Sequence, residues 1–445
     1  MLAWMPLNLW IVEGGQMKQA TLYLLLAALS STGAMGQINC TSGSAQSKLV
    51  CQFPFSTGAL SNDTALGTGQ AGTQALQTAT AVATSLNIAM ASQVSQLPVA
   101  SASAGTVVVY KGGVPETFNN LGPILTDRGQ TIGKGKVFIG YSFSQYVFNN
   151  IDQHPLSALP FAFSREAFGS GGTLQSTTYT TENLRLAFKV NQHVGIATVG
   201  LSNKVDVSAI IPIERVSLGA TTGQSTNYVV DSSNALVLTY PKPSSYSSGR
   251  AFGIGDAIFN VKAMLPSGER SSFAAEVNVR TPSGDDLNFL GSGAWGFNPY
   301  LIYSYLAKLS PHAKIGYQWN TKTELNNPKG TAGRNQSLPG GMVYDIGADY
   351  ALMRRMTVAA DLLGSQFLNT PAIATSSVAV TGLPSGTTLV TSTPVSSSYS
   401  VNNLSAGLKL SPVGNLVFAG NVLVQLNNNG LHIRPTPLVG ISYKF

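Results

Sequence analysis

Hydrophobic and polar residues alternate one by one along most of the chain after residue 136. Leu184, Leu186 and Phe188, for example, alternate with Arg185 and Lys189. A period of two is the period of a β-strand with two different faces. The alternation predicts about twelve strands (range 10–14), at 136–148, 182–201, 205–214, 251–265, 271–282, 294–309, 313–323, 341–352, 356–368, 397–410, 415–427 and 436–445.

The lengths of the connections distinguish two folds that both show this alternation. A soluble β-sandwich also alternates, with its apolar face inside. Here short turns, such as 202–204 and 353–355, alternate with longer loops, such as 215–250 and 369–396. Short turns on one rim and long loops on the other are typical of an outer-membrane barrel. The sequence therefore predicts an all-β fold, a closed transmembrane antiparallel β-barrel over 136–445.

Ionisable residues within these strands are expected to face the lumen. A Lys or Arg on the lipid face at the membrane midplane costs roughly 2–4 kcal/mol. The predicted lumen-lining residues are Arg185, Lys189, Asp206, Asp256, Lys262, Glu276, Arg280, Lys314, Asp345, Asp349, Asp361 and Lys409. Because their signs roughly balance, two interpretations remain open: salt bridges that stabilise the wall, or side chains that line a substrate path.

The amino terminus has the features of an export signal. One lysine follows Met17, an apolar run extends from about Ala20 to Leu29, and Ala34-Met35-Gly36 places small residues where signal peptidase reads them. The apolar run is too short to span a membrane permanently. We expect residues 1–36 to be a signal peptide cleaved before Gln37, with Met17 as the true start.

Residues 37–135 are predicted to form a separate amino-terminal segment. Cys40 and Cys51 lie near its start, and two closely spaced cysteines in an exported protein favour one disulfide over two free thiols. No further cysteine or histidine follows closely, so no metal site is expected.

A long part of this segment carries no charge. Residues 64–110 contain no Asp, Glu, Lys or Arg, and apolar residues recur at helical spacing from Leu76 to Leu97, before Pro98. A soluble surface helix would normally carry charge. Two interpretations remain: a plug inside the barrel mouth, or a flexible periplasmic linker.

The carboxyl terminus resembles a recognition signal. The chain ends in Phe445, and Tyr443 and other apolar residues occupy alternate positions before it. Barrel-assembly machinery recognises such endings, so we expect that machinery to be a partner.

Composition narrows the function further. Charged residues make up 10% of the chain, against about 25% in ordinary soluble domains. The net charge is +7, but Lys and Arg are scattered, so no nucleic-acid site is expected. None of the four histidines, His154, His193, His312 and His432, lies in a serine-centred motif. We expect neither an enzyme nor a cofactor.

Three strings resemble a known family: Gly-Ile-Gly-Asp at 253–256, Thr-Pro-Ser-Gly-Asp at 281–285, and the run 345–352. Over roughly 136–445 the chain is similar to outer-membrane proteins linked to meta-pathway phenol degradation. These are grouped with the FadL-type channels, although twelve strands depart from the fourteen of FadL. The resemblance implies an outer-membrane location and passive uptake of small hydrophobic compounds.

Two functional hypotheses follow. The first is a passive channel whose partners are outer-membrane lipid and a small hydrophobic ligand. The alternative is a structural or adhesive barrel with a filled lumen and no transport.

Overall fold

The computed structural model forms two units, Met1–Gly36 and Gln37–Phe445. It describes residues 5–13, 16–24, 48–53, 83, 85–101, 107–111, 114–118, 120–223, 225–323, 325, 336–384 and 387–445. In the first unit, β1 (Met5–Glu13) pairs antiparallel with β2 (Gln16–Leu24). The boundary between the units falls where cleavage is predicted, and the cleavage itself stays a prediction.

The second unit is built on a closed antiparallel β-barrel. Twelve wall strands form it, and we call each of them a stave because one of the twelve consists of two strands, β12 and β13, in line. The staves are β5 (Val137–Ile151), β8 (Leu174–Gly200), β9 (Val205–Thr222), β12 (Ser245–Ile254) continued by β13 (Ile258–Met264), β14 (Ser271–Arg280), β15 (Gly296–Tyr305), β16 (Leu309–Asn320), β19 (Gly341–Met353), β20 (Met356–Ala379), β21 (Thr388–Leu410), β22 (Leu416–Gln425) and β24 (Thr436–Lys444). The last stave pairs with the first, Ile441 opposite Tyr141, which closes the sheet.

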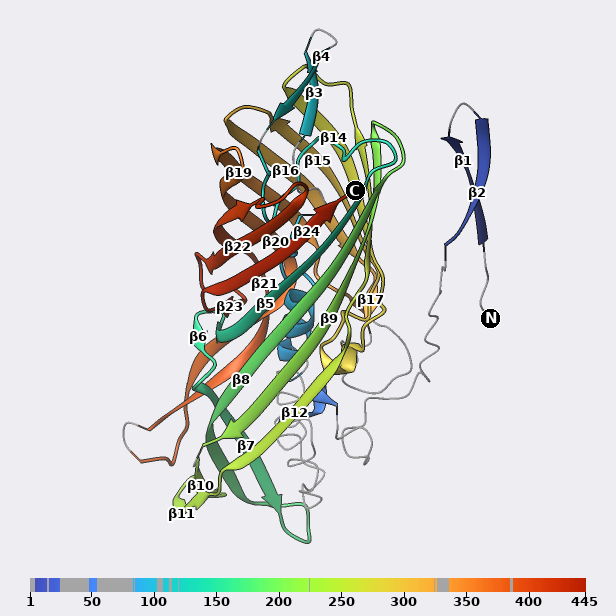
Figure 1. Cartoon of the computed structure of the whole chain (residues 1–445). Helices are drawn as coiled ribbons and strands as arrows, with labels where there is room; N and C mark the ends of the chain where they lie inside the picture. Colours follow the sequence, from blue (N-terminus) through green and yellow to red (C-terminus); the bar gives the residue numbers. More distant parts are fainter. Residues whose placement is uncertain are drawn as a thin grey trace. The chain divides into compact units, whose positions relative to one another are not determined.

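Each predicted strand corresponds to one of these staves, so the predicted strand count is confirmed. The structure differs mainly at the long-loop rim (Figure 1). There β8, β9, β20 and β21 extend well beyond the predicted ends. Shorter elements lie in the connections: β6 (His154–Pro155), β7 (Leu159–Phe168), β10 (Ser225–Asp231), β11 (Leu236–Lys242), β17 (Lys322–Thr323), β18 (Gln336–Ser337) and β23 (Leu431–Ile433). These stretches are rich in Ser and Thr, which weakens the alternation that identified the strands.

One stave is interrupted. The strand predicted at 251–265 is divided into β12 and β13 by residues 255–257. Both parts pair with β9, but only β13 pairs with β14. The connection after β14, which contains η2 (Asp286–Asn288), lies against the interruption. Asp256 there accepts hydrogen bonds from the amides of Gly284 (3.1 Å) and Ser292 (2.8 Å). The Gly-Ile-Gly-Asp string thus lies at the interruption of this wall strand. We call residues 255–257, together with the connection after β14 that contacts them, the wall joint.

The outer face of the barrel is apolar around most of its circumference. Exposed side chains alternate along the staves, as Leu301, Ile315, Ile346 and Val439 show. Aromatic side chains are exposed near the short-turn rim, among them Tyr303, Tyr305, Tyr350, Tyr443 and Phe445. An apolar band flanked by aromatic residues is the surface that a membrane requires of a barrel. The protein is therefore an integral barrel of the outer membrane.

The amino-terminal segment enters the barrel. Residues 85–94 form a helix that lies within the ring of strands (Figure 1). The helix ends before Pro98, as predicted. Residues 120–136 also run inside the wall. A hairpin of β3 (Val107–Lys111) and β4 (Val114–Phe118) lies between the two stretches in sequence. None of the described helices has the length and hydropathy needed to cross a membrane.

The short helix η1 (Leu49–Cys51) packs near the joint, where Lys48 pairs with Asp285 at 2.7 Å. Cys51 is buried, and no described cysteine is free. Cys40 lies outside the described residues, so the Cys40–Cys51 disulfide stays a prediction.

Candidate functional site: a cavity in the barrel lumen

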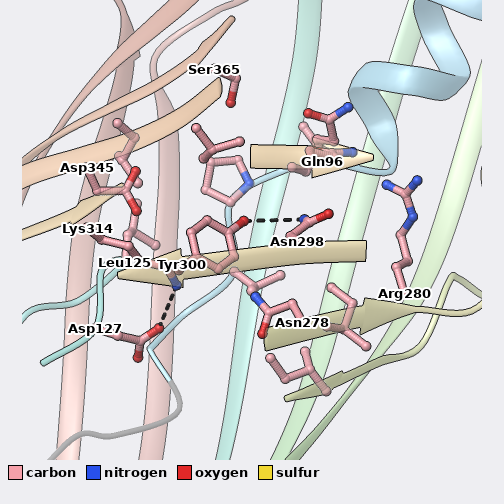
Figure 2. A pocket seen from close by; sticks show the side chains of 18 of the residues that line it. Gln96, Leu125, Asp127, Asn278, Arg280, Asn298, Tyr300, Lys314, Asp345 and Ser365 are labelled. Carbon is pink, nitrogen blue, oxygen red and sulfur yellow. Dashed lines mark hydrogen bonds and ion pairs between the residues drawn. The ribbon is translucent and has the colours of Figure 1, made fainter. Parts of the chain in front are cut away.

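The lumen contains a cavity of about 220 Å³. The stretch 93–101 forms part of its lining, together with Leu125 and Asp127 from the stretch nearer the short-turn rim. Figure 2 shows the polar side of this cavity, where Tyr300, Lys314 and Asn298 converge from β15 and β16. The barrel interior is thus partly filled by the chain's own segments, with a space left between them.

The helix closes the lumen toward the long loops through apolar contacts. Leu86, Ile88, Met90 and Val94 are each at most 2% exposed, so every side of the helix is covered. They join one buried cluster with Phe188 and other wall residues. Buried apolar side chains on more than one face of a helix require packing partners on those faces, and here the barrel wall supplies them. We call residues 85–94 and the wall residues around them the apolar seal.

Two further contacts fix the end of this helix to the wall. The Gln93 side chain donates to the Tyr399 hydroxyl (3.2 Å) and accepts from the Leu431 amide (3.0 Å). The Tyr146 hydroxyl donates to the carbonyl of Pro98 (3.0 Å). The chain therefore leaves the helix in a fixed direction along the cavity.

Residues 120–136 close the lumen at the short-turn rim, and they do so with polar contacts. The Leu121 amide donates to the Thr357 hydroxyl (3.0 Å), and the Ile132 amide donates to Asp206 (2.8 Å). Lys262 on β13 donates to the carbonyl of Arg128 (3.2 Å). Each contact joins the segment to a different stave. We call residues 120–136 and their wall partners the polar seal.

Arg128 is the centre of the polar seal. Its side chain is 1% exposed, and its guanidinium pairs with Asp349 on β19 at 2.9 Å. It also donates to the side chain (2.7 Å) and the carbonyl (3.1 Å) of Asn120, which folds the segment back on itself. Gly122 lies beneath it at φ +84°, where an added Cβ would lie 3.0 Å from the guanidinium carbon. The turn thus requires glycine.

The carboxylate that holds Arg128 belongs to a larger network. His312 on β16 lies between Asp349 (3.3 Å) and Asp361 (2.8 Å). Thr126 of the seal donates to Asp361 (3.4 Å), and Lys409 donates to the carbonyl of Pro123. A buried charge is tolerated only when it is paired and hydrogen-bonded. The charged wall residues of this network therefore depend on residues 120–136 for part of their pairing and hydrogen bonding.

A second charged group lies at the wall of the cavity. Lys314 pairs with Glu276 at 2.8 Å and with Asp127 at 3.2 Å, and its ammonium lies 4.2 Å from the centre of the Tyr300 ring (Figure 2). Burial raises the pKa of Asp127, but the charges of Lys314 and Lys262 and the hydrogen bonds to Ser101 and Lys314 bring it down to about 2. Asp127 therefore stays ionised at neutral pH and holds the polar seal to β16.

Arg280 connects the wall joint to the segment that leaves the helix. Its guanidinium donates to the carbonyl (3.2 Å) and the hydroxyl (3.0 Å) of Ser95 and to Asn320 (2.8 Å). Its Nε lies 3.6 Å from Asp256 at the interruption of the wall. One buried guanidinium thus ties together the joint, β16 and the end of the helix.

The cavity has two chemically different sides. Strands β13 to β16 contribute Asn260, Lys262, Glu276, Asn278, Arg280, Asn298, Tyr300, Lys314 and Gln318. Strands β19 to β23 and β5 contribute Val343, Leu363, Phe367, Val401, Leu431, Ile433 and Phe148. Asp345, Ser365, Asn403 and Gln425 are the polar exceptions on the second side. The space is therefore amphipathic, with a mostly apolar wall opposite a polar one.

Several buried polar atoms of the lining lack a hydrogen-bond partner among the described residues, and one of them, the Oδ1 of Asn298, lies beside Tyr300. The Nδ2 of Asn298 donates to the Tyr300 hydroxyl at 3.3 Å, but its Oδ1 accepts no hydrogen bond from any described residue. An unsatisfied buried acceptor costs about 1–3 kcal/mol. A donor that enters the cavity would remove this cost.

The structure places the residues predicted to face the lumen in three groups. Asp206, Lys262, Glu276, Arg280, Lys314 and Asp345 are buried and line the cavity. Asp256, Asp349, Asp361 and Lys409 are buried in the wall joint or the polar seal. Arg185 and Lys189 differ: they lie on the outward face of β8.

The error at Arg185 and Lys189 has a physical reason. On β8 the buried residues are Leu184, Leu186, Phe188 and those that follow at the same parity. The lumen at this level contains the apolar helix, so the apolar face of the strand turns inward. Alternation alone shows that two faces differ, but it does not show which one meets the lumen.

Other important residues escaped prediction. Arg128 and Asp127 lie outside the alternating strands, and Tyr300 and Asn298 are uncharged. The sequence feature that could have identified these two residues is their charge, because they are the first Asp and the first Arg after the charge-free stretch. Tyr443 and Phe445 are exposed at the rim, with ring centres 4.6 Å apart, and their recognition by assembly machinery stays a prediction.

The fold and the cavity define a class: an outer-membrane β-barrel with an internally sealed lumen. Residues 164–430 match the family described as "Putative MetA-pathway of phenol degradation". The match covers more than half of the chain, and the protein belongs to this family. The sequence matches no curated protein.

Several solved barrels are distantly similar. An outer-membrane channel from Pseudomonas putida F1 is 11% identical, with a TM-score of 0.42 over 72% of this chain and 100% of that chain. A FadL homologue from Pseudomonas aeruginosa is 10% identical, with a TM-score of 0.26 over 70% and 89%. The toluene transporter TbuX of Ralstonia pickettii is 9% identical, with a TM-score of 0.25 over 70% and 90%. The barrel fold is established by this chain's own strand pairing, which closes between β24 and β5.

Proposed function

We propose that the protein is a passive channel for small hydrophobic compounds, and that its lumen cavity binds single-ring aromatic molecules bearing one hydroxyl group. The observation that carries the proposal is the amphipathic cavity between the two seals. Ligand pockets are mostly apolar with a few placed polar groups. A cavity of about 150 Å³ already admits benzene, so the space of about 220 Å³ fits a substituted ring.

The chemistry of the lining supports a hydroxylated ring. The apolar side, including Val343, Leu363 and Phe367, would pack against the ring. The free Oδ1 of Asn298 would accept a hydrogen bond from the hydroxyl. The family description names phenol degradation, and phenol has this combination of an apolar ring and one donor.

The two seals make the proposed transport gated rather than open. A molecule must pass the apolar seal to reach the cavity and the polar seal to leave it toward the short-turn rim. Passive transport requires binding that is favourable enough for entry but weak enough for release. A single hydrogen bond and one apolar wall satisfy that condition.

The alternative hypothesis, a structural barrel with a filled lumen, has less support. The lumen is not filled, and the charges that could have packed it solid border a cavity instead. Catalysis has no support either. His312, the most buried histidine, contacts Asp349 and Asp361 and no described nucleophile.

The test is uptake by cells with an intact outer membrane, because phenol crosses plain phospholipid bilayers unaided. Val343→Trp places a large ring in the cavity, whereas Ile346→Trp, on the same strand, adds the same ring to the lipid face. We expect V343W to lower the initial rate of labelled phenol uptake at least tenfold, toward that of cells without the protein. I346W should leave the rate unchanged.

Two results would count against the proposal. Uptake through V343W at the wild-type rate would separate transport from the cavity. Equal uptake by cells with and without the protein would support the structural alternative. A further comparison tests the hydroxyl: N298A should reduce the preference for phenol over toluene, because the acceptor is lost.

A further inference from the structure

Within the described wall strands, outward-facing Lys and Arg lie on β8, β9 and β12, whereas other exposed basic residues, such as Lys308 and Lys322, lie in turns and short elements. Lys189 on β8, Arg215 on β9 and Arg250 on β12 all lie on the outward face. Arg434 is exposed in the turn before β24. We call these four residues the basic row. Strands β5, β8, β9 and β12 run side by side in Figure 1.

The strand register brings the row to one level. Lys189 is opposite Ser217 on β9, and Ser217 is opposite Arg250 on β12. On the other side Lys189 is opposite Val147 on β5, whose carbonyl accepts a hydrogen bond from the Arg434 amide at 2.9 Å. Adjacent strands lie about 4.8 Å apart, so basic residues follow one another at roughly 10 Å.

Arg215 lies two residues along β9 from Ser217, on the same face, and is therefore closer to the middle of the membrane than Lys189. It is opposite Phe252, and its guanidinium lies 5.7 Å from the centre of that ring. A cation held over an aromatic face keeps a defined direction. The guanidinium is thus presented beside an aromatic residue that suits the membrane interface.

The height of the row is set by strand geometry. Lys189 precedes Gly200, at the short-turn end of β8, by eleven residues. With a rise of about 3.3 Å per residue and a tilt of about 40°, the two are roughly 28 Å apart along the barrel axis. The apolar band of such barrels is about 25 Å tall. Lys189, with Arg250 and Arg434 at its level, therefore lies just beyond the band on the side of the long loops, and Arg215, opposite Asn191, lies near the edge of the band.

Nothing in the described wall neutralises this charge. The outward positions of β5, β8, β9 and β12 contain no Asp or Glu, and Glu182 and Glu214 on these strands face inward. No ion pair among the described residues involves any member of the row. On the long-loop ends of β15 and β16 themselves the exposed large side chains are instead Phe297 and Trp319, and Lys322 follows in β17. The charge is concentrated where lipid headgroups begin.

We propose that the basic row binds the phosphate groups of the phosphorylated glycolipid that forms the outer leaflet of the outer membrane. Guanidinium groups bind phosphate through two parallel hydrogen bonds, and the spaced row can contact more than one phosphate. The site lies outside the lumen and does not depend on what the channel carries.

The test measures binding of purified lipid A to the folded protein in detergent. The lipid carries two phosphates in one sample and none in the other. The row variant combines Lys189→Gln, Arg215→Gln, Arg250→Gln and Arg434→Gln. A matched control removes the same charge at the opposite rim through Lys134→Gln, Lys204→Gln, Arg270→Gln and Arg354→Gln, all exposed residues. Heat-modifiable electrophoretic mobility verifies that each variant is folded.

We expect the row variant to bind phosphorylated lipid A at least tenfold more weakly than the wild type, and the control to bind within twofold of it. Lipid A without phosphates should bind all three proteins with the same affinity. Added salt should weaken only the binding of the phosphorylated lipid. Equal binding by the row variant and the wild type would overturn the proposal, and so would an equal loss in the control. If the row variant does not fold, the R215K/R250K/R434K variant, which keeps the charge, takes its place. It should bind phosphorylated lipid A less tightly than the wild type does, because lysine cannot form two parallel hydrogen bonds to phosphate. Binding as tight as that of the wild type would contradict the proposal.

Discussion

The two seals of the lumen close the same tube by different means. The apolar seal holds the helix 85–94 through close packing, with Met90 and Leu86 each 1% exposed. The polar seal holds residues 120–136 through directed contacts, with Arg128 bonded to both Asn120 and Asp349. Packing tolerates a change of shape if volume is kept. A buried ion pair does not tolerate the loss of one partner.

The two seals should differ in how easily they open. Apolar contacts between helix and wall can slide and re-form, because dispersion and hydrophobic contacts are not directional. The polar seal is held by directed contacts, from Arg128 to Asp349, from Thr126 to Asp361 and from Lys409 to the carbonyl of Pro123. We therefore expect the side toward the long loops to yield to an apolar molecule, and the short-turn side to stay closed until its network is broken.

The largest effect should follow from removing Arg128. Arg128→Ala removes the guanidinium that pairs with buried Asp349, and the loss of one partner of a buried ion pair costs about 3–5 kcal/mol. We expect the free energy of unfolding in urea to fall by this amount and ion conductance in planar bilayers to rise as the segment detaches. Both can be measured on the refolded protein.

A paired variant sharpens this result. Arg128→Met combined with Asp349→Leu removes both charges, and coupled partners deviate from additivity. The double variant should be more stable than R128A alone. If R128A keeps wild-type stability and conductance, the polar seal is not held by this pair.

A smaller effect is expected in the apolar seal. Met90→Leu conserves volume and should cost less than about 1.5 kcal/mol, whereas Met90→Ala should cost roughly 2–5 kcal/mol. The conservative exchange Arg128→Lys should not rescue the polar seal, because lysine lacks the planar fork. Urea unfolding of these variants measures the contrast. If M90L destabilises as strongly as R128K, the two seals do not differ in kind.

Much of the barrel could be predicted from sequence because its physics is periodic. Each strand must turn one face to lipid, so alternation locates strands such as 341–352 closely. The same periodicity could not assign the faces of β8, where Arg185 and Lys189 turn outward. That assignment depends on the helix in the lumen, which is a long-range contact.

The site was less accessible to sequence reasoning. Charged wall residues such as Glu276 and Lys314 could be named, because a charge in a barrel strand has few places to go. Their partners Asp127 and Arg128 could not, since they lie in a segment without regular structure. The cavity itself arises from what the two seals leave unfilled, and no local pattern encodes a space.

The central claim is that a small aromatic molecule occupies the cavity between the two seals. The most direct measurement is titration calorimetry of phenol into the purified protein, with V343W and I346W in the same detergent, so that partitioning into micelles is common to all three. The account predicts saturable binding with one site for the wild type and I346W, and none for V343W. Absence of saturable binding to the wild type, or equal binding to V343W, would contradict it.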